Sequence, residues 1–209
     1  MPGWPNYVAL GDSLTAGRDD YGAEGGRIGW ARRLAAILGT RTGVPCALTN
    51  LAEDGASVDV VLEWQLPAAA RLGPDLISVT VGVNDIRDPG FGADRFAAGF
   101  GRLLDGLTVT GATILTCTLP DIAGIMSLPE DLVGLARQLI GQASDIIRDQ
   151  AAAHGALCLD VWATPAAADP RLFGPDRIHP NASGHQLLAA ACADLLLAGS
   201  PALGRAPGI

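Results

Sequence analysis

Short apolar runs alternate with longer amphipathic stretches along most of this chain. The apolar runs are rich in Val, Ile, Leu and Ala and are bounded by Gly, Pro, Asn or Asp, a pattern typical of strands buried on both faces of a sheet. Five runs predict such strands: Tyr7–Leu10, Cys46–Ala52, Leu76–Val81, Thr113–Leu119 and Leu157–Asp160.

The stretches between these runs carry apolar residues at helical spacing. Phe96, Phe100 and Leu103, for example, fall on one side of a helix. We expect Ser57 to cap the second helix, because a serine hydroxyl can accept a hydrogen bond from the first turn. Helices are predicted over Trp30–Leu38, Val58–Leu72, Ala93–Leu107, Leu132–His154 and Ser183–Leu197.

The alternation of strands and helices predicts parallel βαβ units with helices on both faces of one sheet. The expected fold is therefore α/β, a three-layer α/β/α sandwich around a central parallel sheet of about five strands. The chain contains no internal repeat and no stretch typical of an interdomain linker. We expect a single domain over residues 1–198 and a flexible tail over residues 199–209.

Composition excludes several classes of protein. Of the 209 residues, 49% are apolar and 17% are charged, which indicates a folded chain with a sizeable core. The net charge is −8 and no basic cluster is present, so nucleic-acid binding is not expected. No apolar run approaches the roughly 18 residues of a membrane span, and the N-terminus does not resemble a secretion signal. We therefore expect a cytoplasmic protein.

The cysteines and histidines indicate no metal site. The four cysteines are widely spaced inside apolar segments and show no CxxC pattern, so we expect buried, reduced thiols. Asp176 and His179 could in isolation form a surface turn pair or half of a metal site, but no second cluster of His, Asp or Glu has the spacing of metal ligands. The cysteines are Cys46, Cys117, Cys158 and Cys192.

Polar motifs stand beside four of the predicted elements. In an open parallel sheet, ligands bind beyond the carboxyl ends of the strands, so the predicted fold brings these motifs to one edge. They are Gly11-Asp12-Ser13-Leu14, the segment from Asn50 to Gly55, Gly82-Val83-Asn84-Asp85, and Asp176-Arg177-Ile178-His179.

Three of these residues suit nucleophilic catalysis. The hydroxyl of Ser13 is a weak nucleophile until a neighbouring base accepts its proton, and a histidine such as His179 can do so near neutral pH. Asp176 lies three residues before His179 and can hold the tautomer of its imidazole. The sequence therefore predicts Ser13 as nucleophile, His179 as base and Asp176 as the residue that orients the base.

The four motifs, in this order, resemble those of the GDSL, or SGNH, hydrolase family of esterases and lipases. The start Tyr7-Val-Ala-Leu-Gly-Asp-Ser13 and the pair Gly29-Trp30 resemble actinobacterial members in particular. The resemblance implies the flavodoxin-like SGNH-hydrolase fold and a Ser-His-Asp triad. It also implies an oxyanion hole made by the backbone N–H groups of Ser13 and Gly55 and the side-chain amide of Asn84. No cofactor is implied, because protein groups supply every one of these functions.

Other polar residues near the motifs are expected to have structural roles. Asp12 and Asp85 are assigned to hydrogen bonding, and Asn50 to support of the Gly55 loop. His154 and His185 lie in predicted helices and are poor candidates for the base; we expect His185 to be partly exposed.

Two loops at the same edge of the sheet supply candidates for the substrate pocket. Residues 86–91 offer Arg87 and Phe91, and residues 120–129 offer Ile122, Ile125 and Met126. The second loop is unusually apolar, so it either binds an acyl or aryl group or folds back onto the core. We expect the substrate to be a small-molecule ester, uncharged, with a short-to-medium acyl or aryl group.

Other functions remain open at this point. Acyl transfer, thioester hydrolysis, and deacetylation of a sugar or natural product could use the same triad. A non-catalytic α/β binding module belongs to a different class. Gly11-Asp-Ser-Leu-Thr-Ala-Gly17 matches neither the Walker nor the Rossmann pattern, which argues against phosphate or dinucleotide binding. The sequence indicates no oligomeric state.

Overall fold

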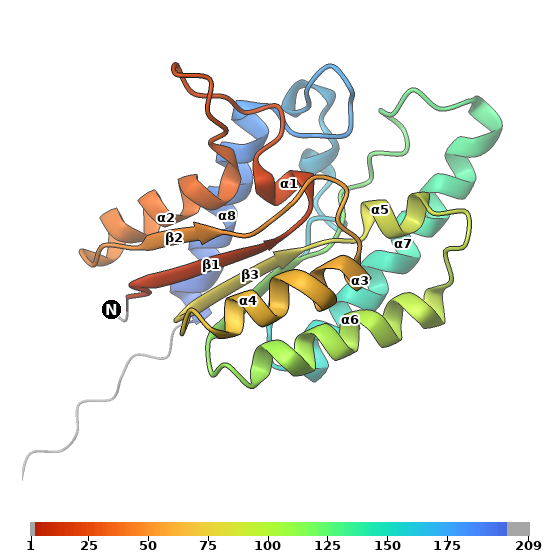
Figure 1. Ribbon diagram of the computed structural model, residues 1–209. Helices are drawn as coiled ribbons and strands as arrows, with labels where there is room; N and C mark the ends of the chain where they lie inside the picture. Colours follow the sequence, from red (N-terminus) through yellow and green to blue (C-terminus); the bar gives the residue numbers. More distant parts are fainter. Residues whose placement is uncertain (1–2, 200–209) are drawn as a thin grey trace, which may run out of the picture.

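The computed structural model describes residues 3–199, and within them five parallel strands form one sheet with helices on both faces (Figure 1). The expected three-layer sandwich is confirmed. Residues 200–209 of the expected tail lie outside the described part of the chain. The strands are β1 (Asn6–Gly11), β2 (Ala47–Asn50), β3 (Leu76–Thr80), β4 (Thr113–Cys117) and β5 (Leu157–Leu159).

Eight α-helices lie within the described residues. α2, α6, α7 and α8 correspond to four of the five predicted helices. The helices are α1 (Ser13–Ala16), α2 (Gly29–Thr42), α3 (Val58–Val60), α4 (Leu66–Ala70), α5 (Val83–Arg87), α6 (Ala93–Thr108), α7 (Glu130–Ala153) and α8 (Ala182–Gly199).

The strand order is β2-β1-β3-β4-β5, so β1 lies between β2 and β3. Val8 of β1 is opposite Thr49 on one side and Ile77 on the other. This doubly wound order places the reversal of strand order beside β1, where ligands bind in such sheets.

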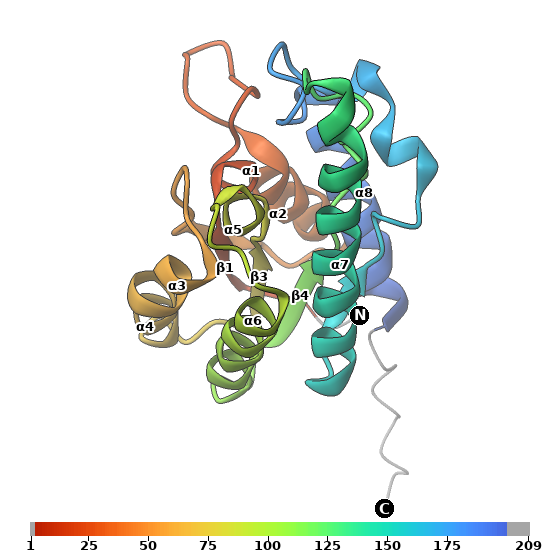
Figure 2. The ribbon, with the colours of Figure 1, turned by 90° about the vertical axis from the view of Figure 1, so that its right-hand side faces the viewer.

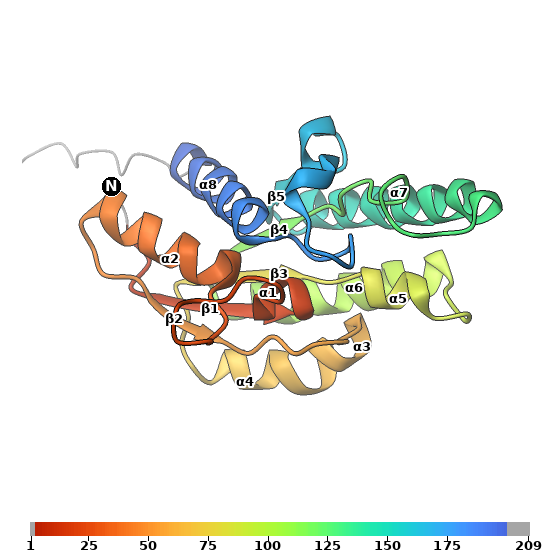
Figure 3. The ribbon, with the colours of Figure 1, turned by 90° about the horizontal axis from the view of Figure 1, so that it is seen from above.

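The central strands β1, β3 and β4 are buried on both faces. The edge strands β2 and β5 are only partly buried, which corrects the prediction that all five strands are buried. Tyr7 and Ala9 pack with Trp30 of α2 and Ala189 of α8, whereas Val8 packs with Phe100 of α6 and the helices beside it. In Figure 3, seen from above, α2 and α8 lie side by side over the sheet. Alternating residues of β1 thus pack into two hydrophobic cores, one on each face of the sheet. This explains why the central strands have continuous apolar runs in the sequence.

The helix expected over residues 58–72 contains one wide π turn, Val61–Gln65, between α3 and α4. Pro67 has no N–H to donate to the preceding turn, and the backbone N–H of Leu66 bonds instead to the carbonyl of Val61. Ser57 stands at the N-cap position, but its side chain does not cap the helix; the carboxylate of Asp85 accepts from the N–H of Val58 at 3.1 Å. The expected Ser57 cap is therefore wrong.

The expectation that His185 is partly exposed is also wrong. His185 is fully buried between α2 and α8, where Nδ1 accepts from the N–H of Trp30 and Nε2 donates to the carbonyl of Arg18. Burial lowers the pKa of this imidazole. The helical period of α8 could not reveal that its first turns are covered by another helix.

Two short helices stand at the carboxyl edge of the sheet. α1 follows β1 directly and α5 follows β3, and the first turns of α7 extend beyond the same edge (Figures 1 and 2). The edge toward which the strands point therefore carries the first three polar motifs on helix starts and loops, and the contact of His179 with Ser13 brings the fourth motif to the same edge. None of the helices between residues 3 and 199 combines the length and apolarity needed to cross a bilayer.

Candidate active site

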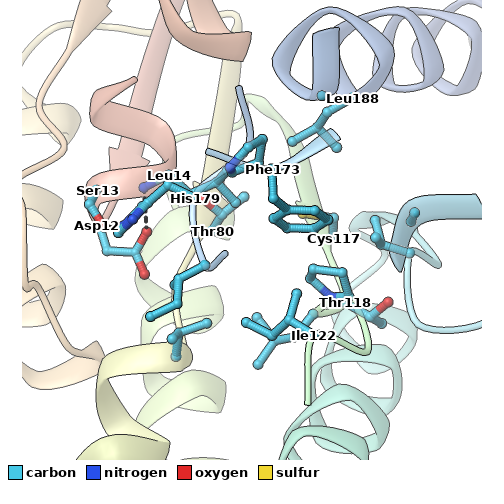
Figure 4. A pocket seen from close by; sticks show the side chains of 18 of the residues that line it. Asp12, Ser13, Leu14, Thr80, Cys117, Thr118, Ile122, Phe173, His179 and Leu188 are labelled. Carbon is cyan, nitrogen blue, oxygen red and sulfur yellow. Dashed lines mark hydrogen bonds between the residues drawn. The ribbon is translucent and has the colours of Figure 1, made fainter. Parts of the chain in front are cut away.

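The end of β1 turns sharply into α1. Gly11 has φ 131°, and a Cβ atom there would lie 2.1 Å from the carbonyl oxygen of Thr80, so only glycine fits. Asp12 caps α1 by accepting from the N–H of Leu14 at 3.0 Å. Ser13 is the first residue of α1, and its side chain borders the main pocket (Figure 4).

The π turn supplies a further support for this bend. Gln65, only 3% exposed, accepts from the N–H of Gly11 at 2.8 Å and donates to its carbonyl at 2.9 Å. Sequence analysis did not single out Gln65. The available signal was a polar residue at helical spacing between Val61 and Ala69, inside an otherwise apolar stripe.

Ser13 and His179 meet although 166 positions separate them, with Oγ and Nε2 2.6 Å apart. Nδ1 of the same ring lies 2.5 Å from Oδ2 of Asp176. The geometry suits a tautomer in which Nδ1–H donates to Asp176 and Nε2 accepts from Ser13. The structure thus brings together the three residues that the sequence predicted as a triad.

Asp176 holds both the ring and the backbone of His179. Oδ1 accepts from the backbone N–H groups of Ile178 and His179, each at 3.0 Å. The turn that permits this needs Arg177 in the left-handed region, φ 57°. Burial raises the pKa of Asp176, but the hydrogen bonds from His179 and Ile178 outweigh it and leave that pKa below its ordinary value. The carboxylate is therefore ionised at neutral pH beside the imidazole.

Gly55 and Asn84 border the same pocket as Ser13. Gly55 is exposed with φ 85°, and its N–H has no acceptor among the described residues. Nδ2 of Asn84 donates to the carbonyl of Ala56 at 3.0 Å and lies 3.5 Å from Oδ2 of Asp12. The two hydrogens of this amide are therefore directed at Ala56 and, in a long hydrogen bond, at Asp12, so an oxyanion would have to replace Asp12 as acceptor of the second hydrogen.

The acidic neighbours of these groups hold the loops in place. Asp85 caps α3 and so joins the Asn84 segment to the Gly55 segment. Asn50 donates to the carbonyl of Thr15 and accepts from the N–H of Ala52. Burial raises the pKa of Asp12 to about 7. These contacts agree with the structural roles expected for Asp12, Asp85 and Asn50.

An ion pair that sequence analysis missed fixes the residue before Gly55. The two terminal guanidinium nitrogens of Arg27, Nη1 and Nη2, donate to the carboxylate of Asp54 at 2.6 and 2.8 Å. This hydrogen bonding lowers the pKa of Asp54, and Arg18 adds a longer contact at 3.8 Å. The pair connects the loop after α1 to the loop that carries Gly55.

A cavity of about 260 Å³ lies beside Ser13 and His179, over the carboxyl ends of β3, β4 and β5. This is at the small end of ligand sites, which commonly span roughly 300–1,000 Å³. Figure 4 shows Ser13 and His179 on one side of it and Cys117, Ile122 and Leu188 on the other. The lining is mostly apolar.

A groove of about 340 Å³ between α5 and α7 adjoins this cavity. Arg87 and Ile122 line both hollows, and Met126 lines the groove. Phe91 and Ile125 line neither. Phe91 packs on Phe96 with ring centroids 5.9 Å apart, and Ile125 turns into the core, so part of the apolar loop does fold back.

One cluster beside Ser13 contains three side chains of types that can bind a metal ion. Asp19 lies with Asp176 and His179 so that one potential metal-ligand atom of each is within 4.8 Å of the others. Both nitrogens of His179 are, however, already engaged by Ser13 and Asp176.

All four cysteines are free, but Cys46 and Cys158 are only half-buried, which corrects the expectation of buried thiols at these two positions.

The fold and the family comparison together define an ester-hydrolysing enzyme. The chain belongs to the GDSL-like lipase/acylhydrolase family, whose model matches residues 9–187. No curated protein sequence matches the chain significantly.

Solved structures share the fold at low sequence identity. LAE5, an alpha/beta hydrolase from the metagenome of Lake Arreo, Spain, is 23% identical with TM-score 0.74, covering 93% of this chain and 96% of its own. Axe2, an acetylxylan esterase from Geobacillus stearothermophilus, is 20% identical with TM-score 0.72, covering 92% and 94%. The acetyl xylan esterase AlAXEase is 23% identical with TM-score 0.72, covering 89% and 96%.

Proposed function

We propose that this protein is a serine esterase that hydrolyses small carboxylic esters through an acyl-enzyme intermediate. The observation that carries the proposal is the unbroken chain of contacts from Ser13 Oγ to His179 Nε2, at 2.6 Å, and from His179 Nδ1 to Asp176, at 2.5 Å. The family membership supports the same reaction class.

In the proposed mechanism, Ser13 Oγ attacks the ester carbonyl while His179 Nε2 accepts its proton. Asp176 stabilises the resulting imidazolium. The carbonyl oxygen becomes an oxyanion, which accepts hydrogen bonds from the backbone N–H groups of Ser13 and Gly55 and from the Asn84 amide. Collapse breaks the bond to the alcohol, which leaves with the proton held by His179. Water then attacks the acyl group on Ser13 with His179 again as base, and the acid is released.

The groove between α5 and α7 fits the acyl group. Val83 lines both the groove and the cavity, and it directly precedes Asn84, the proposed donor to the carbonyl oxygen, in α5. Its lining is apolar and includes Leu132 and Leu135 of α7, which are 43% and 51% exposed. An uncharged short-to-medium acyl or aryl group would bury this surface. The Tyr7–Ser13 segment and Gly29-Trp30 further lead us to infer an actinobacterial-type member of the family.

The experiment is an initial-rate series on p-nitrophenyl esters from acetate to octanoate, with Ser13→Ala in parallel. The proposal predicts hydrolysis by the native protein and loss of at least about 1,000-fold in the variant. Hydrolysis that survives in Ser13→Ala would overturn the role of Ser13. Failure on every ester of the series, with cleavage of a charged sugar ester, would overturn the substrate class.

A further inference from the structure

The cavity beside His179 has an arm that the proposed acyl group does not use. This arm runs from His179 toward the first half of α8 and toward the segment after β5. Its lining includes Phe173, Leu187, Leu188 and Ala191. Leu187 is 50% exposed and is one of the few large apolar side chains of the described residues that face solvent to this extent.

The chemistry of the reaction fixes which part of an ester faces this arm. His179 must donate its proton to the leaving alcohol, so the alcohol oxygen has to lie next to Nε2. The segment that follows His179 in the chain supplies Pro180, Gly184 and Leu188 to the lining, and Leu188 of α8 lies across the cavity from His179 (Figure 4). The carbonyl oxygen and the acyl group face Asn84 and α5, on the other flank.

The hydroxyl hydrogens of the threonines that line the arm are already donated within the protein. The hydroxyl of Thr118 donates to Asp160 and accepts from the N–H of Trp162, and that of Thr164 donates to the carbonyl of Asp160. Thr80, at the floor of the cavity, is bonded to Thr15. Asp12, Arg18, Arg87 and His179 are the only ionisable lining side chains apart from Cys117, and they lie on the Ser13 side or in α5.

A hydroxyl-rich alcohol would therefore find no free donor on these threonines and would replace only part of the hydrogen bonds to water that it loses here. Such losses cost about 1–3 kcal/mol for each buried polar group left without a partner. An aliphatic chain meets no such penalty and covers Leu187 and Leu188. Sugar esters, which the names of Axe2 and AlAXEase indicate for those proteins, do not match this lining.

We propose that the arm between His179 and α8 binds the alcohol part of the ester, and that this alcohol is aliphatic. The inference rests on the proposed function and adds the identity of the leaving group. It predicts that the rate depends on the length of the alcohol separately from the length of the acyl group.

The test uses two series of esters with the purified full-length protein. The first keeps acetate and varies the alcohol from methyl through butyl to hexyl; the second keeps the methyl ester and varies the acid from acetate to hexanoate. In the native protein, kcat/KM is expected to rise about two- to fourfold for each alcohol methylene that enters the arm.

Two variants change the arm and one serves as a control. Leu187→Gln should flatten the alcohol series and leave the slope of the acyl series. Ala191→Met narrows the arm and should shorten the longest alcohol accepted. Val109→Gln, at an 87% exposed position after α6, is matched to Leu187→Gln in chemistry and should change neither slope. Melting temperatures confirm that each variant is folded.

Three results would overturn the inference: no rise with alcohol length in the native protein, a Leu187→Gln variant that flattens the acyl series instead, or faster cleavage of a xyloside acetate than of hexyl acetate. Each of these leaves the esterase proposal standing. Absence of hydrolysis across both series, by contrast, would refute the proposed function itself.

Discussion

The side-chain amide of Gln65 is hydrogen-bonded to both backbone polar groups of Gly11, two residues before Ser13. The helical segment from α3 to α4, which contains Gln65, thereby fixes the bend at the end of β1. The π turn ahead of Pro67 sets the rotation of Gln65 toward the sheet. The position of the proposed nucleophile thus depends on a residue that does not line the cavity.

Replacing Gln65 with leucine should destabilise the protein. The buried N–H of Gly11 would lose its acceptor, and the carbonyl would keep only the bond from the N–H of Glu53 at 3.1 Å, at a cost of about 1–3 kcal/mol in the free energy of unfolding. Urea denaturation measures this change. Gln65→Glu keeps an acceptor for the N–H and should cost less than Gln65→Leu; equal stability of Gln65→Leu and the native protein would contradict the account.

Asp12→Asn should change how stability depends on pH. Burial raises the pKa of Asp12 to about 7 in the folded protein, above its ordinary value of 3.8. The folded protein therefore binds the Asp12 proton more tightly than the unfolded chain does. This difference contributes fully to the free energy of unfolding below about pH 4, and the contribution is lost as the pH rises through 7. Asparagine still accepts from Leu14 but does not ionise. We expect the variant to be about 1–3 kcal/mol more stable than the native protein at pH 8, with a difference that shrinks toward pH 4. Denaturation at several pH values tests this, and a difference independent of pH would contradict it.

Asn84→Ala should lower kcat about 100- to 1,000-fold, because it removes one proposed donor to the oxyanion. The same change removes the bond to the carbonyl of Ala56, so melting temperatures must be compared as well. Asn50→Ala is the matched control. In the native protein the Asn50 amide donates a hydrogen bond to the carbonyl of Thr15, and Asn50 does not line the main cavity. It should reduce stability while kcat stays within a few-fold. Similar kcat losses in the two variants would argue against the role of Asn84.

Asp176→Asn should lower kcat about 1,000- to 10,000-fold with a smaller change in KM. The amide can still accept from the backbone of His179, but it no longer stabilises an imidazolium. Asp169→Asn offers a comparison, since Asp169 caps the short helical turn Pro170–Leu172 and pairs with Arg171 away from Ser13. A small loss in Asp176→Asn would show that His179 does not depend on this carboxylate.

Sequence patterns predicted the layers, the strands and the residues that meet at Ser13. The strands were predictable because β1 and β3 are buried on both faces, and the Ser13–His179 contact followed from the shared edge of a parallel sheet and from the family resemblance. The burial of His185 and the π turn were not predictable, because both depend on which helices pack together. The Arg27–Asp54 pair and the α8 arm of the cavity join distant segments, and no periodicity in either segment indicates its partner.

The most direct test of the central claim is covalent labelling of the native protein with a fluorophosphonate, followed by peptide mass spectrometry. A nucleophilic serine activated by His179 should be labelled at Ser13 in near one-to-one amount, and His179→Gln should slow the labelling by at least about 1,000-fold. Labelling at other serines with Ser13 unmodified, or equal rates in the native protein and His179→Gln, would contradict the proposed serine esterase.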